Sequence, residues 1–386
     1  MALSELLTNH RVVVCVGSGG VGKTTTAAAL AVHEAMRGRR VLCLTIDPAR
    51  RLANSLGLSH MPPEGQQIAA DLFADHGLEV QGTLWAMMVE PKRTFDELVN
   101  KHASSPEARD RIMGNRLYQY VSGSLAGTSE YMAMEKLHAV RSSGEWDLIV
   151  LDTPPTSNAL DFFDAPDKLV TLVDSPAIRW FVQAFEGTGK LSLNLLSKGA
   201  AFLLRGLAKF TGGEFLDQVA EFVTELNELF GGFRQRAEEI REALRSPEVA
   251  YVVVTSTNPL AMNEAVFFHE RLQRAGMQAH AFVINGVHRL LREPTAPTRK
   301  LEEIAAQVLP KEVDAKRAVQ HMWRALDDER SRAVIDRIES DRLKVRVGKG
   351  ILFAEVPAFE SDVHDLGALA RVAHHLTTSE PEATTA

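Results

Sequence analysis

One short loop constrains this 386-residue chain more than any other feature of its sequence. Residues Gly17–Thr24 read Gly-Ser-Gly-Gly-Val-Gly-Lys-Thr, which fits the pattern G-x-x-x-x-G-K-[ST]. The loop follows a β-branched run, Val12–Val16, and precedes an alanine-rich stretch, Thr25–Arg37, with the composition of a helix. This context predicts a phosphate-binding loop, whereas a glycine turn with a surface lysine is the plainer alternative.

The residue types in the loop suit a nucleotide bound together with Mg²⁺. Glycines let backbone N–H groups turn inward around phosphates, and the N-terminus of the following helix adds partial positive charge. We expect Lys23 to reach the β- and γ-phosphates of ATP and Thr24 to ligate Mg²⁺. The expected nucleotide-binding residues here are Gly17, Ser18, Gly19, Gly20, Val21, Gly22, Lys23, Thr24 and Thr25.

The remaining pattern predicts a doubly wound α/β fold with a mainly parallel sheet and an inserted helical subdomain. Further apolar runs that predict strands are Val41–Ile46, Leu84–Val89, Leu148–Leu151, Ala250–Thr255, Ala279–Ile284 and Ile351–Val356. We expect residues 1–176 and 246–376 to form the two parts of the core, the second with a charged helical segment at 299–346. Residues 177–245 read as an apolar helical insert, and 377–386 as a disordered tail.

Two acidic residues follow predicted strands. Asp152 directly follows the run Leu148–Leu151, at the edge of the sheet where α/β folds hold ligands. We expect it to help hold Mg²⁺ through water. Asp47 ends Val41–Ile46 and is a candidate to orient or deprotonate the attacking water. Each has a plainer interpretation: a turn residue for Asp152, and for Asp47 the N-cap of a helix that begins at Pro48.

Composition argues against several other classes of protein. The 43 basic and 50 acidic residues give a net charge of −7 without a basic block, so no nucleic-acid partner is expected. We find no secretory leader and no apolar stretch of about 20 residues, so we expect a cytoplasmic protein without a stable membrane anchor. The two cysteines, Cys15 and Cys43, lie in apolar runs and read as buried thiols; no CxxC motif is present.

Assembled in order, these motifs resemble the family of the arsenical pump-driving ATPase ArsA and the ATPases that target tail-anchored proteins. That family has a deviant Walker A loop, GKGGVGKTT, where this chain has GSGGVGKTT. Its switch I and switch II are similar to Asp47-Pro48-Ala49-Arg50-Arg51-Leu52 and to the stretch that begins Asp152-Thr153-Pro154-Pro155-Thr156. Its adenine-contacting asparagine matches Asn285, and its closing strand and loop match the region of Pro357. The similarity runs from about Arg11 to His375.

The resemblance implies an activity and an assembly. It implies that Asp47 activates the attacking water, and that Asn285 and Pro357 contribute to the nucleotide site. It also implies a dimer that closes around two ATP molecules, with protein clients or membrane partners responding to that closure.

Ser18 is the main departure from the family pattern. The family lysine at this position reaches across the dimer to the partner's nucleotide, which serine cannot do. Three interpretations stay open: a heterodimer with a related chain that keeps the lysine, a slow homodimer or nucleotide-dependent switch, or replacement by another cation such as Arg50 or Arg51.

The insert and the cysteines are further departures. No methionine lies between Met134 and Met262, so a methionine-rich client groove is not supported; the apolar insert either packs on itself or offers a client or partner surface. The lack of further cysteines argues against arsenite efflux. A partition-type ATPase, a small-molecule ligase or kinase and a non-hydrolysing ATP-binding scaffold are the competing functions.

Overall fold

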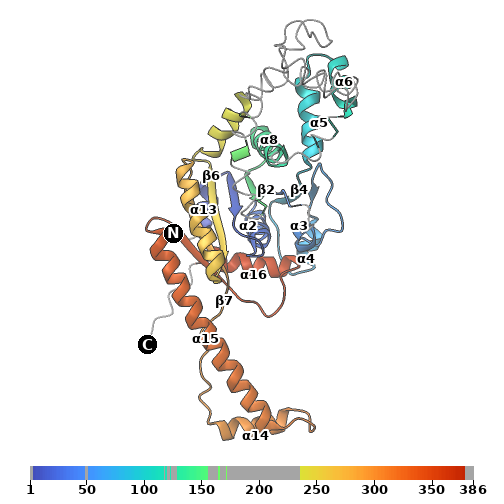
Figure 1. Ribbon diagram of the computed structural model, residues 1–386. Helices are drawn as coiled ribbons and strands as arrows, with labels where there is room; N and C mark the ends of the chain where they lie inside the picture. The colour runs from blue at the N-terminus through green and yellow to red at the C-terminus, as the bar shows by residue number, and fades with distance from the viewer. Residues whose placement is uncertain are drawn as a thin grey trace, which may run out of the picture.

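The centre of the molecule is one eight-stranded sheet with strand order β3-β4-β2-β5-β1-β6-β7-β8 (Figure 1). A computed structural model describes residues 3–47, 51–116, 118–119, 122, 128–154, 164–165, 171 and 235–378. Neighbouring strands are parallel except β3 with β4, which confirms the doubly wound α/β expectation. The strands are β1 Val12–Val16, β2 Arg40–Thr45, β3 Gln66–Gln67, β4 Thr83–Met88, β5 Leu148–Asp152, β6 Val249–Ser256, β7 Ala279–Val287 and β8 Leu352–Pro357.

Helices cover both faces of the sheet, because the central strands are apolar on both sides. In β1, Val12, Val14 and Val16 face one core, whereas Val13 and Cys15 face the other. The second core includes residues of α1 Leu3–Asn9, α2 Lys23–Met36, α3 Arg51–Ser55, α4 Ala70–Ala74 and α16 Leu366–Thr377. The first includes residues of α5 Pro91–His102, α6 Pro106–Gly114, α8 Thr128–Ser143, α13 Pro259–Arg274 and α15 Ala315–Val347.

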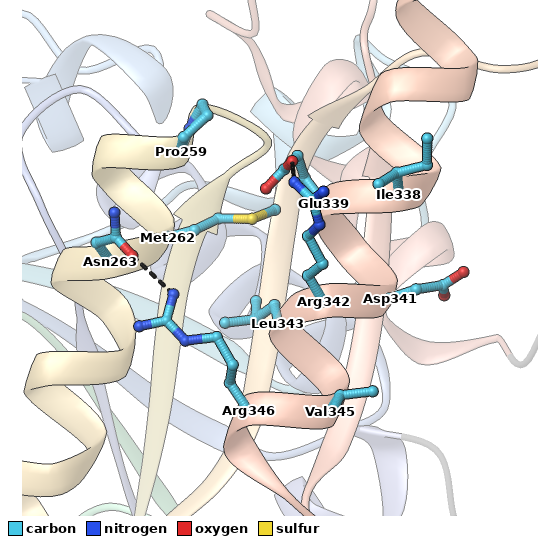
Figure 2. Close-up of a pocket in the computed structure, with 10 residues that line it drawn as sticks. All are labelled: Pro259, Met262, Asn263, Ile338, Glu339, Asp341, Arg342, Leu343, Val345 and Arg346. Carbon is cyan, nitrogen blue, oxygen red and sulfur yellow. Dashed lines mark hydrogen bonds and ion pairs between the residues drawn. The ribbon is translucent and has the colours of Figure 1, made fainter.

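The charged helical segment expected at 299–346 consists of two helices. α14 spans Thr298–Val308 and packs on the 33-residue helix α15, which carries it away from the sheet (Figure 1). The C-terminal half of α15 packs on α13, where Arg346 donates a hydrogen bond of 2.6 Å to Asn263 beside a cavity of about 630 Å³ (Figure 2). Asp336 in α15 accepts a hydrogen bond of 2.8 Å from the backbone N–H of His288, which fixes α15 to the end of β7.

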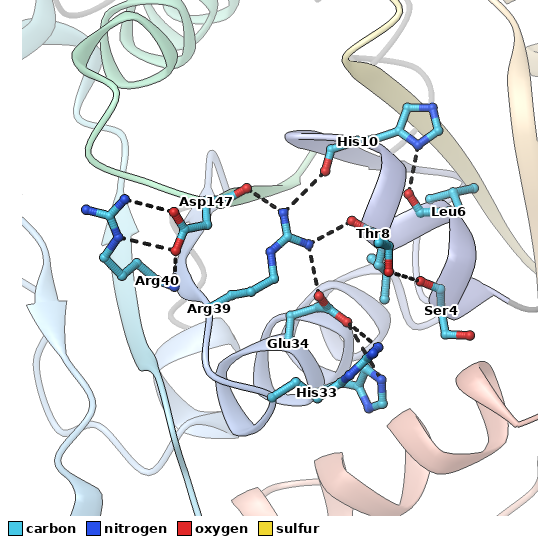
Figure 3. Close-up of polar contacts among 11 residues, drawn as sticks. Ser4, Leu6, Thr8, His10, His33, Glu34, Arg39, Arg40 and Asp147 are labelled. Atoms are coloured by element: carbon cyan, nitrogen blue, oxygen red, sulfur yellow. Dashed lines mark hydrogen bonds and ion pairs between the residues drawn. The ribbon is translucent and has the colours of Figure 1, made fainter.

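A buried ionic cluster joins the elements at the amino ends of the strands (Figure 3). Glu34 in α2 is 2% exposed and pairs with Arg39 at 2.9 Å. The guanidinium of Arg39 also donates to the backbone carbonyls of Leu7 at 2.7 Å and Asp147 at 2.5 Å. One arginine therefore ties α1, α2 and the start of β5 together, and it is the closest cation to a buried carboxylate that Arg37 also contacts, at 3.3 Å.

Parts of the expected domain organisation lie outside the described residues. These are 177–234 of the apolar insert and most of the tail; residues 235–244, which end the insert, are helical. Thr377, expected to start the tail, is instead the buried last residue of α16. Among the described helices none is long and apolar enough to cross a bilayer.

Candidate nucleotide-binding site

The glycine loop lies between β1 and α2, as its sequence predicts. Gly17 has φ +156°, and a Cβ there would lie 2.1 Å from the carbonyl oxygen of Val254 in β6. Gly22 has φ +92° and caps α2; a Cβ there would lie 2.2 Å from Nδ2 of Asn285. Both positions therefore require glycine, because the neighbouring strands leave no space for a side chain.

Lys23 points back into this loop. Its side chain is 7% exposed, and its Nζ donates a hydrogen bond of 2.8 Å to the backbone carbonyl of Ser18. Burial lowers the pKa of Lys23, and the negative charges of Asp152 and Asp47 act in the opposite direction. A buried ammonium held by a single loop carbonyl can move to phosphate oxygens at little cost, because its present partner is neutral.

Asp152 lies at the end of β5 and is fully buried. Its Oδ2 accepts hydrogen bonds from the hydroxyls of Thr24 at 2.8 Å and Thr45 at 3.0 Å. Its Oδ1 has no hydrogen-bond partner among the described residues. Burial raises the pKa of Asp152 to about 6, and the two hydroxyls and the charge of Lys23 limit the rise.

This unsatisfied carboxylate oxygen fits a hydrated Mg²⁺ ion. Mg²⁺ takes oxygen ligands, keeps several waters and is held by one or two protein groups together with phosphates. The Thr24 hydroxyl and the free Oδ1 of Asp152 are the protein oxygens that could hold such an ion. No described group of three or more His, Cys, Asp or Glu side chains suits a metal held by protein ligands alone.

Asp47 lies two residues beyond β2, on the same edge of the sheet. Its backbone N–H donates a hydrogen bond of 3.2 Å to the hydroxyl of Thr45, and its carboxylate is close enough to raise the pKa of both Lys23 and Asp152. Pro48, Ala49 and Arg50 lie outside the described residues. Arg51 is exposed at the start of α3, and its positive charge contributes to the lowered pKa of Lys23.

The ends of β7 and β8 complete this edge of the sheet. Asn285 pairs in register with Val356, so Pro357 lies one residue beyond it. The Asn285 side chain donates a hydrogen bond of 3.0 Å to the carbonyl of Val21 in the loop. The residue expected at the adenine thus also braces the phosphate loop, a contact that nothing in its local sequence indicates.

The stretch that resembles the second switch begins at Asp152, the last residue of β5. Thr153 donates its hydroxyl to the carbonyl of Cys15 at 2.8 Å, and Pro154 follows it; Pro155 and Thr156 lie outside the described residues. Sequence reasoning missed Thr45 and this role of Thr153. The available signal for Thr45 was its place one residue before the end of a predicted strand and two residues before Asp47.

Two further expectations concern Ser18 and the cysteines. Ser18 is only 8% exposed, so the position where the family has its lysine is buried here. Cys15 and Cys43 are free thiols in the core, which confirms their prediction as buried thiols, and burial raises the pKa of both.

The sheet, its helices and the glycine loop define an α/β protein of the P-loop NTPase type. More particularly, the chain belongs to the anion-transporting ATPase family, because residues 10–316 match the profile of that family. Membership of an ATPase family implies nucleotide binding, and it confirms the family to which the motifs pointed.

Curated relatives agree with this assignment. The chain is 24% identical over 277 residues to ATPase GET3 of Malassezia globosa, an alignment that covers 71% of each protein. It is 25% identical over 289 residues to ATPase GET3C of Arabidopsis thaliana, covering 70% of this chain and 65% of the relative. A provisionally named arsenical pump-driving ATPase of Chlorobaculum tepidum is 27% identical over 230 residues, 57% of this chain and 50% of the relative.

Proposed function

We propose that this chain is a Mg²⁺-dependent ATPase that hydrolyses ATP to ADP and phosphate. The observation that carries the proposal is the arrangement around Asp152: a buried carboxylate with one oxygen unsatisfied, hydrogen-bonded to Thr24 and electrostatically close to both Lys23 and Asp47. These are the groups that phosphoryl transfer to water requires, because catalysis there consists mainly of positioning and charge stabilisation.

Each residue then has a defined role. Lys23 exchanges its loop carbonyl for the β- and γ-phosphate oxygens of ATP, and Thr24 and Asp152 hold Mg²⁺, which neutralises phosphate charge when bound. Asp47 orients the attacking water and accepts its proton. Asn285 and Pro357 line the place of the base, with the Asn285 side chain keeping its bond to the loop.

We further propose that nucleotide binding closes a dimer and that this closure regulates a protein client or partner. The support is the resemblance of the switch motifs and the relatives named GET3. Because Ser18 is buried and uncharged, the cation that would act across the dimer has to come from elsewhere. A heterodimer with a lysine-bearing relative satisfies this requirement, and a non-hydrolysing ATP-binding subunit is the second candidate.

The steady-state ATPase rate of the purified chain, alone and mixed with a lysine-bearing paralogue from the same cell, tests this proposal. Lys23→Ala is expected to abolish tight ATP binding, whereas Asp47→Asn keeps binding and stops hydrolysis. Turnover that depends on Asp47 and appears only in the mixture supports the heterodimer. Full turnover by Asp47→Asn would show that the assigned mechanism is wrong, and Asp47-dependent turnover that the paralogue does not change would support a homodimer.

A further inference from the structure

One line of hydrogen bonds crosses the candidate site from the phosphate loop to the first switch. The Thr24 hydroxyl donates to Oδ2 of Asp152 at 2.8 Å, and the Thr45 hydroxyl donates to the same oxygen at 3.0 Å. The backbone N–H of Asp47 then donates to the Thr45 hydroxyl at 3.2 Å. Thr45 is therefore the one side chain in this line that connects Asp152 with Asp47.

The direction of these bonds follows from the chemistry of the groups. A threonine hydroxyl has one proton and two lone pairs, whereas an ionised carboxylate only accepts. The Thr45 proton is committed to Asp152, so a lone pair of the same oxygen is left for the N–H of Asp47. Thr45 is 3% exposed, so water has little access to its hydroxyl and does not readily replace either hydrogen bond.

The strand pairing explains why this residue stands at this place. Thr45 ends β2 and lies opposite Asp152 in β5, and the backbone N–H of Ile46 donates to the Asp152 carbonyl at 3.2 Å. The sheet register thus places the hydroxyl beside the carboxylate. A valine would fill the same β-branched shape and suit a buried strand equally well, so packing alone does not require a hydroxyl.

We propose that Thr45 is a positioning residue for hydrolysis, which couples the state of Asp152 to the place of the Asp47 backbone. The inference rests on the proposed ATPase function for its kinetic consequence, but its geometry does not. If phosphate and a metal ion bind at Thr24 and Asp152, a shift of the Asp152 carboxylate moves the Thr45 hydroxyl that is hydrogen-bonded to it. The Thr45 hydroxyl in turn moves the backbone N–H of Asp47. The role needs the hydroxyl and not the γ-methyl group.

Two substitutions separate these parts of the side chain. Thr45→Val keeps the shape and removes the hydroxyl, whereas Thr45→Ser keeps the hydroxyl and removes the methyl group. In the metal-free full chain, we expect Thr45→Val to raise the hydrogen-exchange rate of the Asp47 amide by about 3–10-fold, the effect of losing one ordinary hydrogen bond. The Ile46 amide, which bonds to backbone, serves as the internal reference and stays unchanged, as does the Asp47 amide of Thr45→Ser.

The kinetic readout uses the chain with its lysine-bearing partner if turnover requires one. We expect Thr45→Val to lower kcat about tenfold or more, as for a misplaced catalytic group, with the Kd of a non-hydrolysable ATP analogue changed less than about threefold. Thr45→Ser is expected to restore most of kcat.

Three results would overturn the inference. The first is a Thr45→Val variant with unchanged amide exchange and unchanged kcat. The others are an equal loss of kcat in Thr45→Val and Thr45→Ser, or a Thr45→Val variant in which only the Kd of the ATP analogue changes. If the wild-type chain shows no turnover under any condition, the proposed ATPase fails. The exchange comparison still decides the positioning role of Thr45 in that case.

Discussion

Replacing Asp152 by asparagine is expected to change how the stability of the metal-free protein depends on pH. Burial raises the pKa of this carboxyl from 3.8 to about 6 in the folded chain. Between these values the folded state holds a proton that the unfolded state has lost, so the free energy of unfolding falls as pH rises through this window. A shift of about two units corresponds to about 3 kcal/mol, an upper bound for the effect.

The asparagine side chain does not titrate, so the stability of the Asp152→Asn variant lacks this decline. The measurement is urea unfolding of wild type and Asp152→Asn in EDTA at intervals from pH 4.5 to 7.5. The free energy of unfolding of the variant minus that of wild type should rise by about 2 kcal/mol across the range and level off above pH 6.5. A difference that is constant or falls with pH would refute the claim that an ionised Asp152 is buried at a cost.

Asp147 provides a matched control of opposite sign. Hydrogen bonds from Arg40 lower its pKa from 3.8 to about 2, so its contribution is present above pH 4 and is lost only as pH falls through that lower window. The curve for Asp147→Asn minus wild type should therefore be flat from pH 5 to 7.5. Adding Mg²⁺ and ATP should stabilise wild type more than Asp152→Asn, because the ligands bind the folded state through the charged carboxylate.

Two matched comparisons of variants test the buried ionic cluster and the glycine loop by denaturant unfolding. Arg39→Met leaves the buried Glu34 without its closest cation and is expected to lower the free energy of unfolding by about 3 kcal/mol. The half-exposed side chain of Arg37 pairs with the same glutamate, so Arg37→Met should lower it by less than about 1 kcal/mol. Equal losses would contradict the role of Arg39 as the main partner of Glu34. Gly22→Ala should cost more than Gly20→Ala: both have positive φ, but only Gly22 meets a neighbour, at 2.2 Å. Adding Asn285→Ala should recover only the contact part of the loss.

The fold was predictable from sequence because buried parallel strands read as short apolar runs. All seven strands expected from such runs are present, and no end differs from its expected position by more than three residues. β3 was missed because two exposed glutamines, Gln66 and Gln67, carry no apolar pattern. The break between α14 and α15, in which Pro310 lies, was not located from sequence, because charge spacing that predicts helix does not mark where one helix ends and the next begins.

The candidate site was predictable where chemistry and chain position coincide. A glycine loop after a strand and an acid at the end of another strand predict the meeting of Thr24 and Asp152, and the two side chains are 2.8 Å apart. Contacts that depend on register were not predictable: Thr45 meets Asp152 only because β2 pairs with β5 at those residues. Likewise Asn285 and Val21 are 264 positions apart, and only the order of the strands brings them together.

The charges gathered at this edge of the sheet explain why metal and partner both matter to the proposed function. Lys23 lies within electrostatic range of two carboxylates, Asp47 and Asp152, and of one further cation, Arg51, so these ionised side chains carry no excess of positive charge before a nucleotide arrives. A triphosphate alone would add repulsion from the carboxylates, and the proposed Mg²⁺ would reduce it. A lysine at position 18 would have added one more positive charge, which Ser18 does not supply. The positive charge of Arg51 contributes to the lowered pKa of Lys23. In the proposed function, residues of this chain bind the phosphates, whereas a cation that acts across a dimer would have to come from a side chain other than the buried, uncharged Ser18.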